Sequence, residues 1–339
     1  MATWKSVCCA AQGKGHLKTG TPCQDKVFQQ LRNGTYAVAL ADGAGSAVFS
    51  HFGAECIVHQ ICDYLTGHFE ELFSQEDGRQ VKRELLEKMK SALEGIAAER
   101  ECKVSDLAST VLAVAVHADC YIIAHIGDGV IGYLKEHNLK VASAPDNGEF
   151  SNVTTFVTSS EALASMRLFK GKLNNISAFV LMSDGTEQSL YHKPTKSLGG
   201  AVIKLMQKTC LLDSAVMEKR LGNTLTSVVM RNTQDDCSIA ILARPLDALR
   251  SLEELTSAER QELFQISSAD RYAKLRLRQY DEIIKILKRP RTLQQIARKI
   301  HLRFRHTEKP SNTLSTRKHL ETLLEVGVIV KTGSLYSCV

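Results

Sequence analysis

Long apolar runs are missing from this sequence of 339 residues. No stretch of about 18 consecutive apolar residues occurs, which argues against a membrane-spanning helix and a membrane partner. The segment from Met1 to Cys9 lacks a charged start followed by an apolar core, so we expect no signal peptide. The 10 cysteines include no Cys-x-x-Cys pair, which argues against a zinc site. Because Cys56, Cys62 and Cys120 lie inside apolar runs, we expect reduced thiols in a cytoplasmic protein.

The composition supports a folded core and an uneven charge. Hydrophobic residues make up 44% of the chain, which is long enough for one large domain and a smaller one. Residues 1–250 contain 26 Lys+Arg and 27 Asp+Glu, whereas residues 251–339 contain 17 and 10. The C-terminal part therefore carries the whole positive excess, which indicates two units with different partners.

Hydrophobic periodicity predicts an α+β protein. The pattern predicts amphipathic helices at residues 51–73 and 79–98, and further helices at 198–207 and 214–221. Asn33-Gly34 between two apolar runs is typical of a hairpin turn. Two antiparallel sheets stacked face to face with helices outside would satisfy this order. We expect strands at residues 4–11, 27–31, 36–41, 111–116, 121–126, 130–134, near 141, 176–182 and 239–242.

Aspartates stand at the ends of four of these β-prone runs. Asp42 and Asp184 each end an apolar run before glycine, Asp128 lies between Gly127 and Gly129, and Asp235-Asp236 precede the last run. Any one of them alone is most simply a turn residue. Together they suggest one shared cluster of hard oxygen ligands, which suits Mg²⁺ or Mn²⁺ better than zinc.

From about Trp4 to Ala243 the chain resembles the metal-dependent protein phosphatases of type 2C, particularly the compact bacterial members. Each motif is short, but all occur in the family's order. The resemblance implies a four-layer α-β-β-α sandwich and hydrolysis of phosphoserine and phosphothreonine in proteins. A cognate kinase is then a candidate partner. The matching segments are Cys23-Gln24-Asp25, Ala41-Asp42-Gly43-Ala44-Gly45, Ser109-Thr110, Gly127-Asp128-Gly129, Ser183-Asp184-Gly185 and Asp235-Asp236-Cys237-Ser238.

The same resemblance assigns ligands to two Mn²⁺ or Mg²⁺ ions. It implies that Asp42 bridges both ions, that the Gly43 carbonyl reaches one, and that Asp25 assists through water. Asp184 and Asp235 would hold the other ion. Asp128, with Asp184, matches the site of a third, looser ion, and Asp236 would be an outer ligand. Asp42, Asp184 and Asp235 are thus the expected catalytic residues, since two ions close together lower the pKa of a bridging water.

Two positions depart from the family pattern. Many relatives bind the phosphate with an arginine, and the corresponding position in this sequence lies near Gly20. His16 or Lys18 is therefore the candidate phosphate ligand. A lysine lacks the bidentate fork of an arginine. The histidine of the family's Asp-Gly-His-x-Gly variant is Ala44 here, which leaves His16 or a metal-bound water to protonate the leaving group. The segment 147–152 resembles a loop beside the site in bacterial relatives and is open to a plain surface role.

The C-terminal part resembles a winged-helix domain: three short helices followed by a hairpin. We expect a phosphatase domain at residues 1–245, a helical connector at 246–278 and the winged helix at 279–339. Residues 271–318 carry 15 Lys+Arg and 3 Asp+Glu. Thr316, Arg317 and Lys318 on the third helix are the candidate nucleic-acid or partner contacts. DNA and an acidic protein both remain open as partners, and the protein is favoured because fold alone does not fix function.

The sequence thus predicts a metal-dependent serine/threonine phosphatase with a C-terminal module for targeting or regulation. The alternative is a regulatory or DNA/protein-binding winged-helix protein whose first domain is a weak or inactive phosphatase.

Overall fold

Two compact units make up the protein in a computed structural model: Met1–Thr209 with Ser214–Arg244, and Cys210–Asp213 with Pro245–Val339. The structure describes residues 4–136, 138–145, 154–244, 252–253, 255–267, 269–307 and 311–338. The segment 147–152 lies outside the described residues. Within the described parts, no helix is long and apolar enough to cross a membrane.

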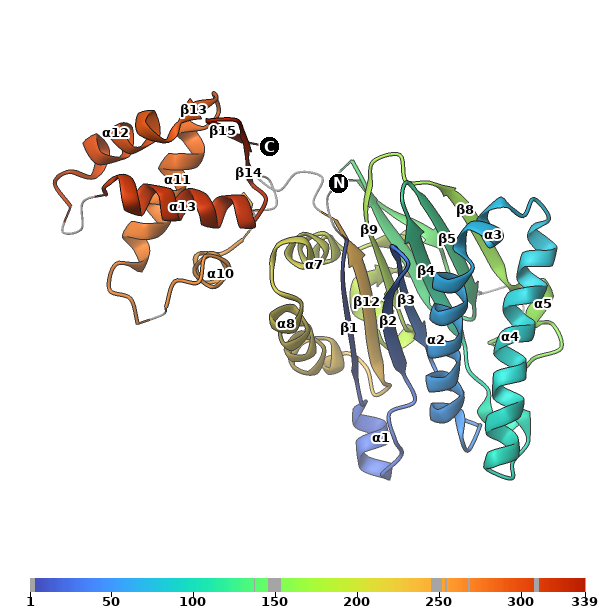
Figure 1. The fold of residues 1–339 in the computed structure, drawn as a ribbon. Helices are drawn as coiled ribbons and strands as arrows, with labels where there is room; N and C mark the ends of the chain where they lie inside the picture. The colour runs from blue at the N-terminus through green and yellow to red at the C-terminus, as the bar shows by residue number, and fades with distance from the viewer. Residues whose placement is uncertain are drawn as a thin grey trace. The chain divides into compact units, whose positions relative to one another are not determined.

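The first unit contains two antiparallel five-stranded sheets, shown in Figure 1. The β9 sheet is formed, in spatial order, by β1 (Lys5–Ala11), β12 (Cys237–Ala243), β9 (Ile176–Met182), β6 (Val130–Lys135) and β7 (Asn138–Ser143). The β4 sheet is formed by β2 (Lys26–Arg32), β3 (Thr35–Ala41), β4 (Val111–His117), β5 (Cys120–Ile126) and β8 (Arg167–Lys172).

Alternation along β3 explains how the β4 sheet is covered on both faces. Val38 and Leu40 belong to the core between the two sheets. Ala37, Ala39 and Ala41 belong instead to the core beneath the helices. Successive strand residues point to opposite faces, so one strand supplies both layers. The alanines leave room for a helix to pack closely against this sheet.

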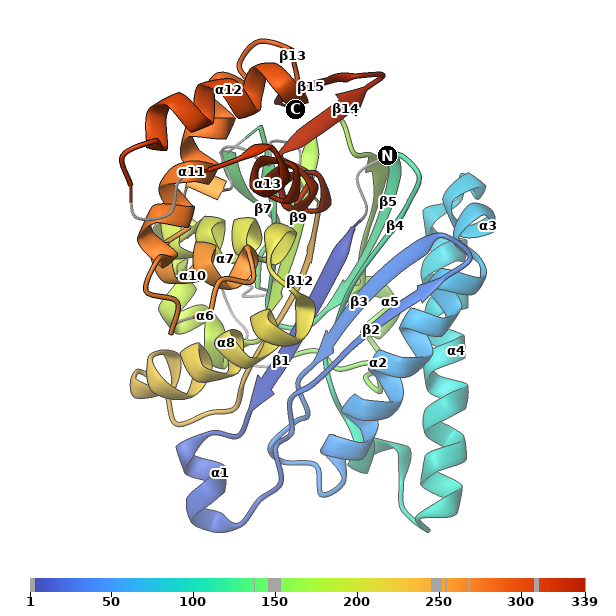
Figure 2. The ribbon, with the colours of Figure 1, turned by 60° about the vertical axis from the view of Figure 1, so that its left-hand side comes forward.

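Helices cover the outer faces of both sheets. On the β4 sheet these are α2 (Ser50–Gly67) and α4 (Gly78–Glu99), while α7 (Gly200–Leu211) and α8 (Ser214–Ser227) lie on the side of β1 (Figures 1 and 2). In α2, Ile57, Ile61 and Leu65 recur at helical spacing and are fully buried against the sheet. The expected four-layer sandwich is confirmed.

The shorter helices and turns of this unit are α1 (Lys14–Thr19), α3 (Phe69–Ser74), η1 (Val104–Leu107), α5 (Ala162–Ser165), α6 (Asp184–Leu190), η2 (Lys193–Thr195) and η3 (Val229–Arg231); β10 (Tyr191–His192) and β11 (Ser197–Leu198) form a small hairpin.

The second unit contains helices and a three-stranded sheet of order β13-β15-β14. Three of its helices, α10, α12 and α13, begin at polar caps: the side chains of Thr256, Thr292 and Asn312 each accept a backbone N–H three residues on. Its buried residues include Ile283, Ile300 and Leu320. The elements are α10 (Ser257–Leu263), α11 (Ala273–Ile286), β13 (Arg291–Thr292), α12 (Leu293–Phe304), α13 (Thr313–Glu325), β14 (Ile329–Thr332) and β15 (Leu335–Cys338).

Strand β8 and helix α6 are among the elements not expected from the sequence, and one helix begins earlier than expected. Strand β8 carries Lys170, Gly171 and Lys172, so its pattern is too polar to stand out, yet it pairs along β5. Helix α6 begins directly at Asp184, where the Asp-Gly pair suggested a turn. Helix α11 begins at Ala273, ahead of the expected start of the winged helix at residue 279.

Gly53 marks a tight contact that a substitution can test. A Cβ at Gly53 in α2 would lie 1.9 Å from the carbonyl oxygen of Leu107. We expect Gly53→Ala to lower the free energy of unfolding by about 2–4 kcal/mol, measured by calorimetry. The matched control is Gly95→Ala on the exposed face of α4, where a Cβ meets nothing within 4 Å. It should stabilise by ~0.5–1 kcal/mol. Equal effects of the two variants would contradict the contact.

Candidate active site

Strand pairing brings the acidic strand ends to one edge of the sandwich. In the β4 sheet, Lys26 pairs with Ala41, so the start of β2 adjoins the end of β3. In the β9 sheet, Ile239 pairs with Met182, so the start of β12 adjoins the end of β9. The charges at these ends act on one another: Asp42 is influenced by Asp25, Asp184, Asp235 and Asp128. We call these five residues the acid cluster.

Thr110 at the start of β4 holds Asp42 in place. The Asp42 N–H donates to the Thr110 hydroxyl at 2.9 Å. The Thr110 N–H donates back to the Asp42 carbonyl at 2.8 Å. This reciprocal pair fixes the backbone just beyond the last paired residue of β3. The following residue, Gly43, forms a bridge with Ser109. The side chain of Asp42 is therefore carried on a rigid strand end.

Ser183 and Gly185 position Asp184 beside β12. The Ser183 N–H donates to the Ser238 carbonyl at 3.2 Å, and the Ser238 N–H donates to the Ser183 hydroxyl at 3.0 Å. A Cβ at Gly185 would lie 2.1 Å from the Asp236 carbonyl oxygen. The residue after Asp184 must therefore be glycine for α6 to begin this close to Asp235 and Asp236.

Burial and mutual repulsion disfavour the charged forms of three carboxyls in the cluster. Burial, and then the charges of Asp25 and Asp184, raises the pKa of Asp42 well above its ordinary value. Burial raises the pKa of Asp25 to about 7, opposed by the nearby Ser238 and Ser183 hydroxyls and reinforced by Asp236 and Asp184. Burial and the charge of Asp128 raise the pKa of Asp184 to about 6. Without a positive partner, these carboxylates destabilise the folded chain at neutral pH.

The cluster has the chemistry of a site for hard divalent cations. Neither carboxylate oxygen of Asp25, nor Oδ1 of Asp184, accepts a hydrogen bond from any described residue, although all three atoms are buried. Buried carboxylates are normally paired or bound to metal. In the described parts of the chain, no three His, Cys, Asp or Glu side chains converge as ready-made ligands. Mg²⁺ and its relatives typically take one or two carboxylates together with waters and substrate oxygens. The donor set fits such ions.

The contacts of Asp236 differ from those of the outer metal ligand that the sequence predicts. Its Oδ1 accepts the Gly13 N–H at 2.6 Å, and its Oδ2 accepts the Gln24 N–H at 2.5 Å. The Gln24 carbonyl in turn accepts the Gly43 N–H at 3.2 Å. Asp236 is 2% exposed and ties the loops that follow β1 and precede β2 to the start of β12. Its oxygens are thus engaged by the protein itself.

The two candidate phosphate ligands on α1 are placed differently. His16 Nδ1 lies 2.9 Å from Asp236 Oδ2, at ion-pair distance although not in hydrogen-bond geometry. His16 also lines a pocket next to Asp235. Lys18 is exposed and is not among the residues that line this pocket. The structure thus brings His16 to the acid cluster, while Lys18 faces solvent.

The loop that carries Asp128 rests on a polar network that no sequence pattern predicts. Arg167 in β8 donates to the Gly127 carbonyl at 2.9 Å and lies 3.1 Å from His125 Nε2. His125 Nδ1 is 2.8 Å from the Ser143 hydroxyl, and burial lowers the pKa of His125 well below its ordinary value. A neutral imidazole beside the guanidinium avoids like-charge repulsion.

An ion pair next to the cluster, between a buried glutamate and an exposed lysine, was also missed. Glu187 in α6 is 1% exposed, and its carboxylate lies 2.5 Å from Lys193 Nζ. Burial raises the pKa of Glu187, opposed by Lys193. The hydrogen bond with Glu187, together with the charges of Asp184 and Asp128, raises the pKa of Lys193. Lys193 therefore places a positive charge near the cluster, although nothing in its sequence context signals this.

In the second unit, the expected contact residues of α13 are only partly available. Thr316 is 0% exposed, and its hydroxyl is 3.4 Å from that of Ser311. The expectation that Thr316 contacts a partner is therefore wrong, because its side chain faces the core of this unit. Arg317 and Lys318 are exposed.

Comparisons with known proteins agree with this fold. The chain is 27% identical over 195 residues to Serine/threonine-protein phosphatase 3 of Escherichia coli K12, covering 55% of this chain and 75% of the relative. A Streptococcus agalactiae (S. agalactiae) serine/threonine phosphatase structure matches with 14% identity, a TM-score of 0.50 and coverage of 71% and 99%. The serine/threonine phosphatase Stp1 of Staphylococcus aureus matches with 15% identity, a TM-score of 0.50 and coverage of 72% and 95%. These two similarities concern the fold.

Fold and sequence together define a protein phosphatase. The model of the protein phosphatase 2C family matches residues 12–242, and the chain belongs to that family.

The raised pKa of Asp25 makes a testable prediction for the metal-free protein. The folded carboxyl retains a proton up to about pH 7, whereas the ordinary value is 3.8. Stability due to the protonated carboxyl is therefore lost as the pH rises between these values. In EDTA, we expect Asp25→Asn to raise the Tm relative to the parent protein. The corresponding gain in the free energy of unfolding should grow from pH 5 to about pH 7 and level off at a few kcal/mol at most.

The matched control for Asp25 is Glu94→Gln on the exposed face of α4, which removes a charge outside the cluster and should leave the pH profile of Tm unchanged. Parallel profiles for the parent protein and Asp25→Asn would contradict the raised pKa. Added Mn²⁺ should stabilise the parent protein more than Asp25→Asn, because a cation offsets the same repulsion.

Proposed function

We propose that the protein hydrolyses phosphoserine and phosphothreonine in proteins and depends on Mn²⁺ or Mg²⁺, with the corresponding kinase as its counterpart. The observation that carries this proposal is the acid cluster: carboxylates from the ends of several strands act on one another, and three buried oxygens of Asp25 and Asp184 accept no hydrogen bond from the described residues. Membership of the protein phosphatase 2C family agrees with this chemistry.

The acid cluster and its neighbours would hold the ions. Asp42 and the Gly43 carbonyl would bind one ion, with Asp25 acting through water. Asp42, Asp184 and Asp235 would bind the second ion, and Asp128 with Asp184 would bind a third, weaker one. When bound, such ions activate water as a nucleophile and neutralise charge on the phosphoryl oxygens. No nucleophilic side chain is needed.

The protein's own residues orient the substrate and handle the leaving group. Asp236 pins the loops on which Asp25 and His16 lie, so its part is to position them. His16 stands in the pocket wall beside Asp235, where an imidazole can donate a hydrogen bond to the phosphate or a proton to the seryl or threonyl oxygen. Lys193 adds positive charge that draws the phosphate dianion toward the cluster.

Asp42→Asn tests the central role of the acid cluster. We expect kcat/KM for a phosphothreonine peptide with Mn²⁺ to fall by roughly 10²–10³-fold, because a charged ligand is lost. The Mn²⁺-induced rise in Tm should shrink as well, which reports on ion binding independently of turnover. The control is Asp119→Asn in the exposed turn between β4 and β5. Equal rates for the parent protein and Asp42→Asn would reject the phosphatase proposal.

The same assay separates the candidate phosphate ligands. His16→Ala should lower kcat/KM by about 10–100-fold, as for loss of an acid–base or phosphate contact. Lys18→Ala should leave it unchanged because Lys18 is exposed. A loss confined to Lys18→Ala would reverse this assignment.

The alternative is a regulatory protein with a weak or inactive phosphatase domain. The missing family arginine and histidine favour it, whereas the intact acid cluster favours an active enzyme. Activity that requires Mn²⁺ and Asp42 distinguishes the two.

For the second unit, we propose a winged helix that docks an acidic protein partner. The order α11, β13, α12, α13, β14, β15 supports the winged-helix interpretation. The exposed side of α13 mixes Arg317 and Lys318 with Glu321, which is unfavourable for tracking DNA phosphates. Further exposed cations lie on α12, at Arg298, Lys299 and Arg303, and at Arg305 directly after it; Arg303 pairs with Glu282.

Salt dependence of DNA binding tests this preference. We expect the full-length protein to bind a DNA duplex weakly, with a slope of log K against log[salt] no steeper than about −2, measured by fluorescence anisotropy. Arg317→Ala should leave binding unchanged. A slope of about −5 or steeper that Arg317→Ala reduces by about one would instead establish phosphate contacts by α13.

A further inference from the structure

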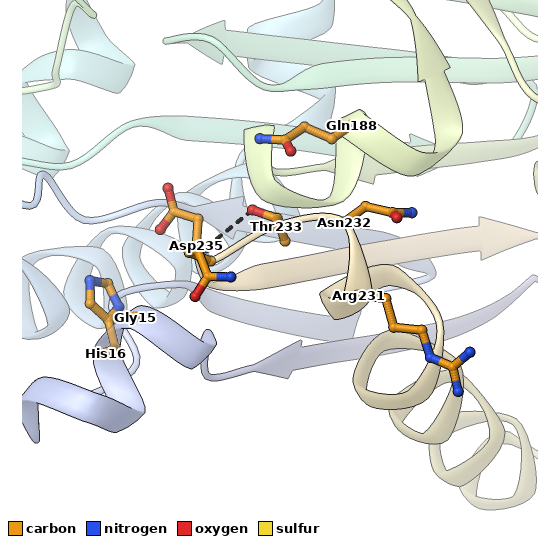
Figure 3. Close-up of a pocket in the computed structure, with 8 residues that line it drawn as sticks. Gly15, His16, Gln188, Arg231, Asn232, Thr233 and Asp235 are labelled. Carbon is orange, nitrogen blue, oxygen red and sulfur yellow. Dashed lines mark hydrogen bonds between the residues drawn. The ribbon is translucent and has the colours of Figure 1, made fainter.

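A polar pocket adjoins the acid cluster on the side of Asp235. Its volume is about 490 Å³. It is lined by residues from four segments: Gly15 and His16 from α1, Gln188 from α6, Arg231 from η3, and residues 232–235 before β12. Figure 3 shows His16 and Arg231 on opposite sides of the segment 232–235, with Gln188 above that segment. A substrate whose phosphate lies at the acid cluster would place its neighbouring residues here.

Several polar groups of the pocket are not used by the protein itself. The Arg231 guanidinium is exposed and makes no hydrogen bond or ion pair with any described residue. The side-chain amides of Gln188 and Gln234 are likewise exposed and unpaired within the described parts of the chain. By contrast, Asn232 donates to the Ser189 hydroxyl at 3.1 Å, and Asp236 engages His16. The unused groups are therefore available to a ligand.

The charges at the two ends of the pocket differ in sign. The end at Asp235 belongs to the acid cluster, where cations and a phosphate would sit. The end at Arg231 offers a guanidinium, whose planar fork matches a carboxylate in a bidentate pair. Side-chain amides such as those of Gln188 and Gln234 can both donate to and accept from a peptide backbone. This combination fits an extended peptide with an acidic side chain near its phosphorylated residue.

We infer that this pocket is a substrate subsite that selects phosphopeptides with Glu or Asp flanking the phosphorylated residue, through Arg231. The inference rests on the proposed phosphatase function and adds its sequence preference. Arg231 is a specificity residue, because it lies apart from the acid cluster and does not contact the reacting atoms. Exposed ion pairs are weak, so the preference should be modest.

The test compares phosphothreonine peptides that differ only in carrying Glu, Ala or Lys at the flanking positions. With Mn²⁺, the parent protein should show about 3–10-fold higher kcat/KM for the Glu peptide than for the Lys peptide, mainly through KM. Arg231→Ala should abolish this difference, and Arg231→Glu should reverse it. Hydrolysis of p-nitrophenyl phosphate, which has no flanking residues, should be the same in all variants.

Arg83→Ala is the matched control, because Arg83 is an exposed arginine on α4, on the opposite side of the sandwich (Figure 1). It should retain the preference for Glu. Equal rates on all peptides by an active parent protein would overturn the subsite and leave the phosphatase proposal standing. A preference that survives in Arg231→Ala would overturn the role of Arg231. Failure to hydrolyse any phosphopeptide or p-nitrophenyl phosphate would overturn the phosphatase proposal itself, and the subsite with it.

Discussion

Repulsion between buried carboxylates is the constraint around which the first unit is built. Antiparallel pairing forces the end of β3 against the start of β2, and the end of β9 against the start of β12. Each of these places carries an aspartate. The backbone ladders and the serine and threonine hydroxyls hold the strand ends in register despite this repulsion. Protons relieve this repulsion in the metal-free protein, as the raised pKa values of Asp25, Asp42 and Asp184 indicate, and divalent cations can relieve it without moving the strands.

The protein uses identical side chains in opposite ways a short distance apart. Asp25 and Asp236 are both almost fully buried. Asp236 receives two backbone N–H groups and lies beside His16, so its charge is stabilised by the protein and serves architecture. Asp25 receives no hydrogen bond from the described residues, and burial raises its pKa. The donors around each carboxylate, and not the residue type, separate the structural acid from the one available to a cation.

Two networks of polar side chains lie around the acid cluster. Arg167 and the neutral His125 support the Gly127 carbonyl, directly before Asp128, from β8. The Glu187–Lys193 pair adds a positive charge near Asp184 and Asp128. The pocket beside Asp235 provides groups that can bind the rest of a substrate. In the second unit, Thr316 faces the core, whereas Arg317 and Lys318 on α13 and Arg298 and Lys299 on α12 are exposed.

The sequence by itself determined the local features of this protein. Apolar alternation and helical spacing predicted the strands and the main helices, and Asn33-Gly34 predicted the hairpin turn, where both residues have positive φ. Strand-end aspartates in a family order predicted which residues form the acid cluster. Only the tertiary structure decided which hydrogen bonds each acid receives, that Lys18 faces solvent while His16 lines a pocket, and that Arg167 and Lys193 lie near the cluster and Arg231 in the pocket wall. These properties depend on hydrogen-bond partners and burial supplied by segments far away in the chain, such as Gly13 to Asp236, and local pattern carries no information about such partners.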